Sequence, residues 1–324
     1  MSRFARQMIL PEVGAKGQAR LARAHVLVVG AGGLAAPILQ YLAGAGLGQI
    51  TLMDPDHVEE SNLHRQPLFT MADIGRAKVA AARDYLLARN PDLQLHARLD
   101  LLDACTAGPA VSQVDLVLDA ADSFAASYIL SDACKAQSKP LISASVLGQK
   151  GYVGGFCGGQ APSLRALFPD LPDSAASCVT AGVMGPVVGL IGALQAQMAL
   201  QVLLQQQHPS PLGQLMQVDM ANLTLSGFRF DGAEEPDAPL RFTSVARLTA
   251  QDQIIDLRPP QEARKTITPA ARRILPGDIN ALEIDVQRPL VLCCRSGLRA
   301  WKVARQLQKR GISQITILAA GDTQ

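Results

Sequence analysis

The chain has 324 residues, of which 48% are hydrophobic but only 4% aromatic, and its formal net charge is +2. This length allows two domains or one large one, and an aliphatic composition is typical of packed α/β layers. A nearly balanced charge gives no reason to expect nucleic acid or an anionic membrane as a partner.

Residues 4–23 precede the first predicted strand, and we expect them to form a helical arm outside a sheet. No apolar signal segment follows the early arginines Arg3 and Arg6, and the six cysteines are scattered without a C-x-x-C pair. We therefore expect a reducing, cytoplasmic setting. The apolar stretch 181–204 is interrupted by glycines and carries glutamines, so we predict a buried core helix and no membrane span.

Residues 25–54 predict a strand, a glycine turn, a helix and a second strand. The turn contains Gly30, Gly32 and Gly33, which let backbone N–H groups approach a phosphate at a helix N-terminus. Asp54 ends the second strand about 20 residues later and can accept hydrogen bonds from ribose hydroxyls. This pattern predicts nucleotide binding, although an ordinary glycine-rich turn would look similar. It does not distinguish NAD, FAD and ATP.

The loop and helix after Asp54 contain more specific polar side chains than a connector needs: Asn62, Arg65, Gln66 and Lys78. Asp73 is the expected N-cap of the helix that carries Lys78.

Further strands are predicted at residues 93–95, 114–119 and 140–144, with a helix at 127–137. Asp122 follows the strand 114–119, so it should share the ligand-binding edge of a parallel sheet with Asp54. Two carboxylates facing a triphosphate need cations between them, which Arg65, Lys78 and a magnesium ion can supply. This combination favours ATP over NAD.

Six segments resemble the ThiF/MoeB/HesA family of adenylating enzymes, relatives of the ubiquitin-activating enzymes: RFARQMIL, VLVVGAGGLAAPILQYLAGAGLG, DPDHVEESNLHRQ, IGRAKVAAA, VDLVLDAADS and SCVTAGVMGPVVGLIGALQAQMAL. The resemblance implies a Rossmann-like, doubly wound α/β adenylation domain of the ubiquitin-activating type at residues 1–230. It also implies ATP-dependent adenylation of the C-terminal Gly-Gly carboxylate of a ubiquitin-like sulfur-carrier protein.

The same resemblance implies a role for each matching residue. The glycine turn would lie against the nucleotide, Asp54 would bind the ribose, and Asp122, followed by Ser123, would coordinate magnesium. Arg6 resembles an arginine that reaches into the neighbouring subunit's site, which implies a homodimer. Arg65 and Lys78 would stabilise charge on the phosphates, and no protein nucleophile is needed for this step. The residues implied to line the phosphate site are Ser61, Asn62, Leu63, His64, Arg65, Gln66 and Lys78.

The chain departs from the family at several positions. Two C-x-x-C pairs usually hold a zinc ion, but the first would fall at Ser163 and Ala166, and residues 230–239 contain no cysteine. We therefore predict no structural zinc. Ser123 stands where asparagine is usual, and Ala35 where glycine is common.

Cys178 matches a family cysteine that can form a covalent link with the carrier. Its setting, SAASCVTAG, is small and polar, which indicates an accessible thiol. The alternative is a structural cysteine at a helix start.

Residues 231–243 are predicted to be a linker, and residues 244–324 resemble a short rhodanese domain. Asp256, Arg258 and Glu262 match its D-x-R-x-x-x-E signature. The active cysteine would be Cys294 rather than Cys293, because the rhodanese loop has the pattern C-R-S-G-x-R. A cysteine in a loop between a strand and a helix can hold a persulfide, which would come from a persulfide sulfur donor. The alternative is a non-catalytic appendage. The implied rhodanese loop contains Cys294, Arg295, Ser296, Gly297 and Arg299.

The segments QPLFTMADIGRAK and TAGVMGPVVG look closer to ThiF than to MoeB, so we predict a ThiS-like carrier from the thiazole branch of thiamine biosynthesis. A MoaD-like carrier for molybdopterin biosynthesis is the alternative. Two other classes remain open: a non-catalytic module that binds ubiquitin-like proteins, and a dinucleotide oxidoreductase.

Overall fold

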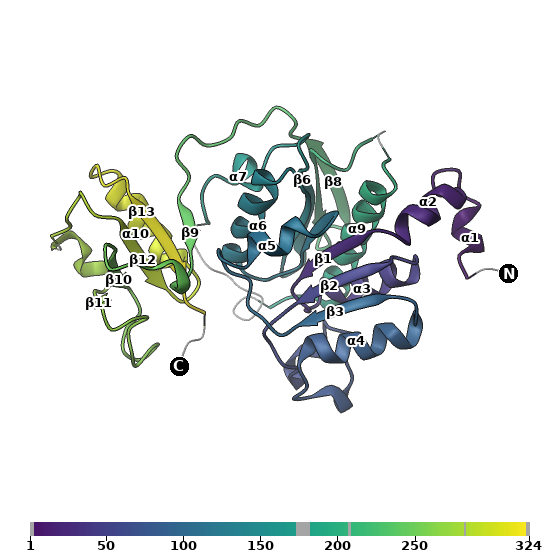
Figure 1. The fold of residues 1–324 in the computed structure, drawn as a ribbon, viewed down its shortest axis with the longest axis horizontal. Helices are drawn as coiled ribbons and strands as arrows, with labels where there is room; N and C mark the ends of the chain where they lie inside the picture. The colour runs from purple at the N-terminus through teal and green to yellow at the C-terminus, as the bar shows by residue number, and fades with distance from the viewer. Residues whose placement is uncertain (1–2, 173–181, 207–208, 282, 322–324) are drawn as a thin grey trace.

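The computed structural model of the chain describes residues 3–172, 182–206, 209–281 and 283–321, which form two sheets (Figure 1). The larger sheet has the order β3-β2-β1-β4-β5-β6-β7-β8. Its strands are β1 (His25–Val29), β2 (Gln49–Met53), β3 (Gln94–Arg98), β4 (Leu116–Asp119), β5 (Pro140–Leu147), β6 (Lys150–Cys157), β7 (Gln214–Asp219) and β8 (Thr224–Arg229).

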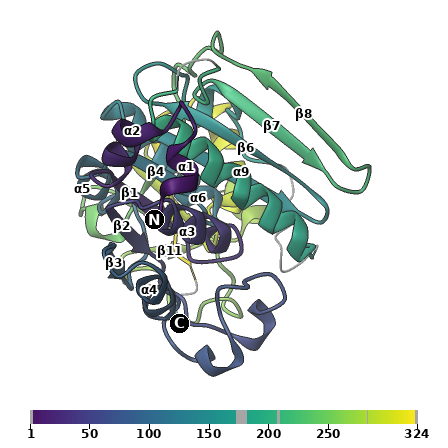
Figure 2. The same cartoon turned by 90° about the vertical axis from the view of Figure 1, so that its right-hand side faces the viewer.

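Strands β3, β2, β1, β4 and β5 are parallel, and β6 to β8 continue the sheet as antiparallel strands. The chain passes from β1 to β2 on one side and returns to β4 on the other. The carboxyl ends of β1 and β4 therefore flank the point where the strand order reverses, which is where such sheets bind ligands. In Figure 2, β7 and β8 extend away from the helical layers.

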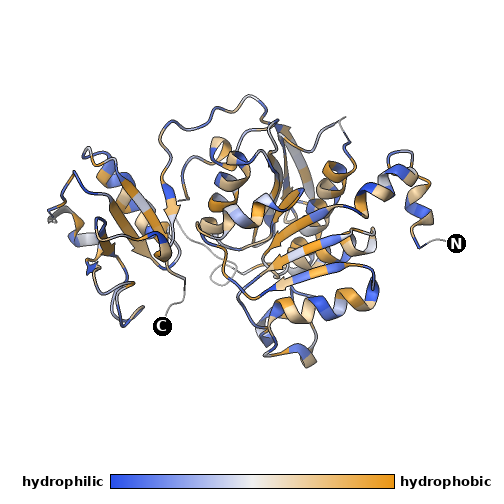
Figure 3. Cartoon of the chain, in the orientation of Figure 1, coloured by the Kyte–Doolittle hydropathy of each residue, from blue (hydrophilic) through white to orange (hydrophobic). Residues whose placement is uncertain are grey.

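Helices cover both faces of this sheet. One face packs against α3 (Ala35–Gly44), α4 (Lys78–Arg89) and α9 (Gly185–Leu203), and the other against α5 (Ala107–Ser112) and α6 (Phe124–Ala136). The alternation within β1 explains this, because Val26 and Val28 join one apolar cluster while Leu27 and Val29 join the other. Hydrophobic residues are concentrated in the strands between these layers (Figure 3).

Helix α9 is long and apolar enough to span a membrane by length and composition. It contacts α3, β5 and β6, and Ile191 and Gln195 on it are fully buried. Its apolar character is therefore accounted for by the core of the first sheet. Other helices among the described residues are the arm helices α1 (Ala5–Met8) and α2 (Gly14–Leu21), the short α7 (Leu164–Leu167), and the 3-10 helices η1 (Glu60–Asn62), η2 (Met71–Asp73), η3 (Val245–Arg247) and η4 (Pro276–Ala281).

The smaller sheet is parallel throughout, in the order β11-β10-β12-β13-β9. It contains β9 (Arg241–Thr243), β10 (Gln253–Asp256), β11 (Arg272–Arg273), β12 (Leu290–Cys294) and β13 (Ile315–Ala319), and α10 (Leu298–Gln308) packs against β12 and β13. Strand β9 lies inside the segment predicted to be a linker. Phe242 of this strand is buried and pairs with Ile317 of β13. One apolar cluster continues from the first sheet into the second.

Local boundaries differ from the sequence predictions where tertiary pairing extends an element. Strand β3 continues to Arg98 because it pairs along its length with β2. Helix α6 begins at Phe124 rather than residue 127, because the Ser123 hydroxyl accepts a hydrogen bond from the N–H of Ala126 and caps it. Cys294 is the last residue of β12 rather than the first residue after it.

Candidate functional site

The glycine turn is packed between three other segments. Gly30 has a φ of +95°, and a Cβ there would lie 2.6 Å from the carbonyl oxygen of Ala120 in the loop after β4. At Gly33 a Cβ would lie 2.6 Å from Val188 Cγ1 and 2.8 Å from the carbonyl oxygen of Arg65. Side chains are therefore excluded at both positions. The turn is in direct contact with α9, the 61–66 segment and the loop that carries the candidate magnesium ligand.

Asp54 is only 6% exposed and ties the turn to the end of β2. Its Oδ2 accepts a hydrogen bond of 2.6 Å from the N–H of Ala31, and its Oδ1 accepts one of 2.8 Å from the N–H of Asp56. Burial raises the pKa of Asp54, while the Ala31 N–H and the Lys78 ammonium act in the opposite direction. Each carboxylate oxygen keeps acceptor capacity for a further donor, such as a ribose hydroxyl.

Lys78 is 6% exposed, and its ammonium lies 2.9 Å from Oδ2 of the exposed Asp56. It is the first residue of α4, so its position is set by the helix start. The prediction that Asp73 caps this helix is wrong. Asp73 ends η2, where its carboxylate accepts hydrogen bonds from the N–H and hydroxyl of Thr70, and the N-cap of α4 is Ala77. The local bond to Thr70 outcompetes capping of a helix that starts five residues later.

The 61–66 segment folds over the turn. Asn62 is buried, and its Oδ1 accepts a 3.2 Å hydrogen bond from the N–H of Glu59, which caps η1. Arg65 is half-buried, and its guanidinium donates to the carbonyl oxygen of Ser61 at 3.0 Å and lies 2.9 Å from His64 Nε2. Leu63 packs against the core, whereas Ser61 and His64 are exposed.

Gln66 differs from its neighbours because it is 4% exposed and its Oε1 has no hydrogen-bond partner among the described residues. A Cβ on Gly32 would lie 3.7 Å from Gln66 Nε2, so the amide borders the open part of the turn. An unpaired buried acceptor costs about 1–3 kcal/mol unless a ligand or water satisfies it. Gln66 and Gly32 therefore mark the part of the turn where a bound nucleotide could supply a donor.

Asp122 is exposed in the loop between β4 and α6, at the same sheet edge as the glycine turn. Next to it, Ser123 acts as the N-cap of α6 through a 3.5 Å bond from Ala126 N–H. Asp122 is therefore free to provide one carboxylate, which is the usual protein share of a magnesium site that also uses substrate phosphates.

Asp119 is a residue of this site that the sequence interpretation missed. It is fully buried, its Oδ2 accepts a 2.7 Å bond from the Ser143 hydroxyl, and its Oδ1 accepts a 3.2 Å bond from the N–H of Ala121. Gln195 on α9 donates to its carbonyl oxygen at 2.7 Å. Burial raises the pKa of Asp119 to about 6, against the opposing effect of hydrogen bonds from Ser127, Ser143 and the N–H of Ala121. The carboxyl group of Asp119 fixes the loop that carries Asp122. In the sequence, the feature that could have revealed this role is an acidic residue at the end of a buried strand.

Arg6 lies on the opposite edge of the sheet from the turn. The ring of Phe4 packs against Gly46, before β2 begins, and Gln7 donates a 2.8 Å hydrogen bond to the carbonyl oxygen of Ala45. The glycine turn follows the carboxyl end of β1, at the far end of the parallel strands. The exposed Arg6 is therefore not brought to the glycine turn of its own chain.

Cys294 lies at the carboxyl edge of the second sheet and is fully buried. The N–H of Ala300 donates to its Sγ at 3.4 Å, and Arg299 is hydrogen-bonded to the same cysteine. Arg299 also pairs with both carboxylate oxygens of Glu262. Gly297 has a φ of +86°, which permits the sharp turn into α10. The sulfur atom of Cys294 thus has two donors, the N–H of Ala300 and the guanidinium of Arg299.

The neighbouring residues of this loop have different surroundings. Cys293 faces the opposite side of β12, where burial raises its pKa to about 12. Arg258 and Asp256 form a buried ion pair of 2.7 Å beneath the loop. Arg295 and Ser296 are exposed on it. Cys178 lies outside the described residues.

The positions expected for zinc ligands carry a different network. Ser163 donates its hydroxyl to Glu235 Oε2 at 2.6 Å and its N–H to Oε1 at 2.8 Å. The ammonium of Lys135 lies 2.8 Å from the same carboxylate. Within the described part of the chain, no group of three or more histidine, cysteine, aspartate or glutamate residues could hold a metal ion.

Two curated relatives match this chain over different shares of its length. An adenylyltransferase and sulfurtransferase MOCS3 from Culex quinquefasciatus is 39% identical over 277 residues, which is 81% of this chain and 63% of that protein. A sulfur carrier protein adenylyltransferase from Thermus thermophilus is 43% identical over 211 residues, which is 63% of this chain and 78% of that protein. For a Drosophila willistoni MOCS3 relative the matched region is 45% of the relative's length.

Solved structures share the fold. Escherichia coli MccB with ATP has a TM-score of 0.61 at 20% identity over 73% of both chains, and PaaA has a TM-score of 0.59 at 20% identity over 70% of this chain and 72% of that one. The predicted Rossmann-like α/β fold is thus confirmed. The ThiF family model matches residues 4–240, well over half of the sequence. The chain belongs to the ThiF family.

Proposed function

We propose that the chain adenylates the C-terminal carboxylate of a ubiquitin-like sulfur-carrier protein at the expense of ATP. The observation that carries this proposal is the convergence of the glycine turn, Asp54, Lys78, the 61–66 segment and Asp122 at one sheet edge. The printed name of the Thermus thermophilus relative, sulfur carrier protein adenylyltransferase, supports the substrate class. The MccB structure with ATP supports the nucleotide.

In the proposed reaction, a carboxylate oxygen of the carrier attacks the α-phosphorus of ATP. A bond to the α-phosphate forms, the bond to the bridging oxygen breaks, and pyrophosphate leaves. Lys78 and Arg65 stabilise the charge on the equatorial oxygens as it develops. Lys78 is suited to this task because it is already buried and oriented by Asp56. The backbone N–H groups of the glycine turn can donate hydrogen bonds to the phosphate oxygens.

Asp122 would hold magnesium together with the ATP phosphates. It fits this role because its carboxylate is exposed, whereas Asp54 and Asp119 use both carboxylate oxygens for their own chain. The ion would offset the phosphate charge when bound. No carboxylate besides Asp122 is required at this position.

We also propose a homodimer in which Arg6 reaches the site of the partner subunit. Arg6 lies at the opposite end of the parallel strands from the glycine turn of its own chain, so it does not reach that turn. Mixing an inactive Arg6→Ala variant with an inactive Asp122→Ala variant should restore roughly a quarter of the wild-type activity, since each mixed dimer keeps one intact site. No recovery after subunit exchange would contradict the shared site.

Sulfur transfer is assigned to Cys294. Its thiolate would take the outer sulfur of a donor persulfide, and the donor thiolate would leave. The Cys294 persulfide would then attack the acyl adenylate of the carrier with AMP as the leaving group, and a second thiol would cleave the resulting acyl disulfide to release the carrier thiocarboxylate. The printed word sulfurtransferase in the MOCS3 relatives supports this, as do the donors around the thiol. The same relatives weigh towards a molybdopterin-type carrier, against the ThiS-like preference drawn from the sequence. A covalent link between Cys178 and the carrier remains a proposal that rests on the sequence alone.

The test is ATP–pyrophosphate exchange with magnesium and each purified carrier in turn. Exchange should depend on one carrier, and Asp122→Ala should lower its rate by about 100-fold or more if a charge-compensating ligand is lost. Asp92→Ala, a change at an exposed acid on the opposite edge, is the matched control. Carrier binding without exchange would favour a non-catalytic binding module, and exchange with neither carrier would refute the substrate class.

A further inference from the structure

A side chain from outside the loop packs against the loop that follows Cys294. Cys294 has no exposed surface, and the chain turns at Gly297 before α10 begins. A Cβ on Gly297 would lie 2.7 Å from Cε1 of Phe242 and 3.5 Å from Ile317 Cγ2. The ring of Phe242 therefore rests directly on the backbone of the loop that covers the thiol.

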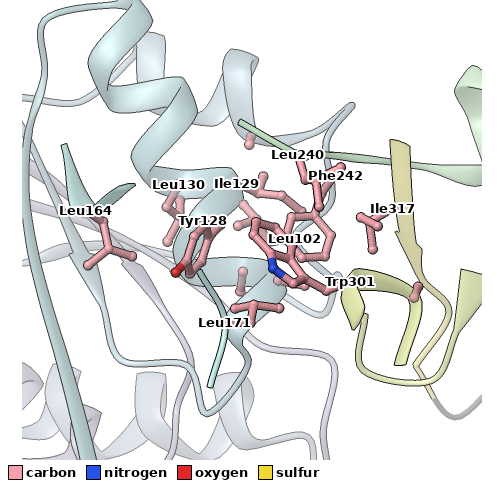
Figure 4. Close-up of a cluster of buried hydrophobic side chains, with 14 of the residues drawn as sticks. Leu102, Tyr128, Ile129, Leu130, Leu164, Leu171, Leu240, Phe242, Trp301 and Ile317 are labelled. Atoms are coloured by element: carbon pink, nitrogen blue, oxygen red, sulfur yellow. The ribbon is translucent and has the colours of Figure 1, made fainter. Parts of the chain in front are cut away.

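Phe242 is itself held in a cluster of three aromatic rings (Figure 4). Its ring stacks on Trp301 of α10 with centroids 6.1 Å apart and contacts Tyr128 of α6 edge-on at 6.4 Å. Tyr128 and Trp301 meet edge-on at 5.7 Å. Such pairs stabilise a cluster beyond the effect of their burial. The three rings come from α6, β9 and α10, so the ring that contacts Gly297 also packs against a helix of the first sheet.

The Tyr128 side of this cluster is fixed by further contacts. Its hydroxyl donates a 2.6 Å hydrogen bond to the carbonyl oxygen of Phe168. The guanidinium of Arg165 lies 4.7 Å from the Tyr128 ring centroid and 5.9 Å from that of Trp301. Arg165 is 2% exposed and makes a two-point ion pair with Asp132 at 2.6 and 3.0 Å. Side chains of α6 and α7 thus hold one side of the aromatic cluster in place.

We propose that Phe242 is a positioning residue for Cys294, whose ring holds the 295–297 loop closed over the thiol by bracing Gly297 against the Tyr128–Trp301 pair. The functional part of this proposal rests on the proposed sulfur transfer through Cys294. A persulfide under a closed loop is shielded from water and reductants, and transfer then requires the loop to open. The ring of Phe242 sets how often that happens.

The experiment measures alkylation of each cysteine by iodoacetamide in the folded protein, with peptide mass spectrometry as the readout. Phe242→Ala should speed the alkylation of Cys294 by about tenfold or more, because a lost core ring weakens packing by more than the ~1.4 kcal/mol that a tenfold change represents. Phe242→Leu, which keeps a smaller apolar side chain at this position, should give a rate between those of the wild type and Phe242→Ala. Phe228→Ala on the exposed strand β8 is the matched control and should change nothing.

Cys134 of α6 and Cys157 at the end of β6 are both buried and serve as internal references. Their alkylation should stay slow in every variant, whereas general loosening of the protein would expose them together with Cys294. An unchanged Cys294 rate in folded Phe242→Ala, or equal increases at all three cysteines, overturns the proposal. If Phe242→Ala does not fold, the same comparison is made with Phe242→Leu, for which a Cys294 rate equal to wild type overturns it.

Sulfur transfer and pyrophosphate exchange are measured in parallel to separate this proposal from the proposed function. Pyrophosphate exchange should stay unchanged in Phe242→Ala, because the ring does not touch the glycine turn. A wild-type protein that transfers no sulfur would refute the role of Cys294 as a sulfur carrier. The alkylation ratio would still decide whether Phe242 holds the loop closed.

Discussion

Single carboxyl groups set the local architecture of this protein. Asp119 is the clearest case, since a fully buried carboxyl holds the N–H of Ala121 and the hydroxyl of Ser143 beneath the loop that presents Asp122. Glu235 is a second, because it joins the segment after β8 to α6 and α7. Both residues make pH-dependent contributions to stability, and the two contributions have opposite signs.

Replacement of Asp119 by asparagine should make stability less dependent on pH. Burial raises the folded-state pKa of Asp119 to about 6 from an ordinary value of 3.8. Its stabilising contribution is therefore complete below pH 4 and is lost as the pH rises through 6, a loss on the order of 3 kcal/mol. Relative to wild type, Asp119→Asn should gain that amount between pH 4 and pH 8 in urea unfolding. A constant difference across this range would contradict the prediction.

Glu235→Gln should lower the free energy of unfolding at pH 7 by about 1 kcal/mol. Burial alone would raise the pKa of Glu235, but the hydrogen bonds from Lys135 and Ser163 bring it below the ordinary value of 4.5. Its contribution is therefore present above pH 4.5 and is lost as the pH falls through the folded-state pKa. Denaturant unfolding of Glu234→Gln, a change at the exposed neighbouring residue, provides the control. A deficit that persists at pH 3 would point to lost packing instead.

Among the elements of the fold, the glycine turn depends on the segments that pack around it. Residues 26–33 predict a strand and a turn from their local pattern, and β1 and the turn are found there. What the pattern does not contain is the contact of Gly33 with Val188, 155 positions later in the sequence, or with the backbone of Arg65. The wrong prediction for Asp73 has a different origin, since a local bond to Thr70, three residues earlier, decided the outcome.

Gly33→Ala should therefore destabilise the protein by roughly 1–3 kcal/mol and weaken ATP binding. The new methyl group would have to displace Val188 or the carbonyl of Arg65, and so shift the turn and the 61–66 segment together. Gly44→Ala provides a matched control in α3, where a Cβ would meet nothing within 4 Å. Thermal unfolding and ATP titration of both variants measure the effect. Equal behaviour of the two variants would show that the turn has room to relax.

The whole molecule behaves as a unit because one apolar cluster runs through both sheets. Trp301, the only tryptophan in the sequence, lies in the aromatic cluster between them. Its fluorescence should therefore change at the same denaturant concentration as the far-ultraviolet circular dichroism signal of the whole chain. If the fluorescence changes first, the second sheet undocks before the first unfolds. Arg165→Gln, which removes the charge between Tyr128 and Trp301, should lower both midpoints together.

The sequence by itself determined the strand, glycine turn, helix and second strand, the family, and the places of strands β3, β4 and β5. These features depend on periodicity, turn chemistry and segment spacing, which are local properties. Only the tertiary structure decided that Asp119 supports the loop of Asp122, that Arg6 lies on the far edge, and that Phe242 rests on Gly297. Each of these facts depends on contacts between residues far apart in the chain, and such contacts leave no pattern in a single sequence.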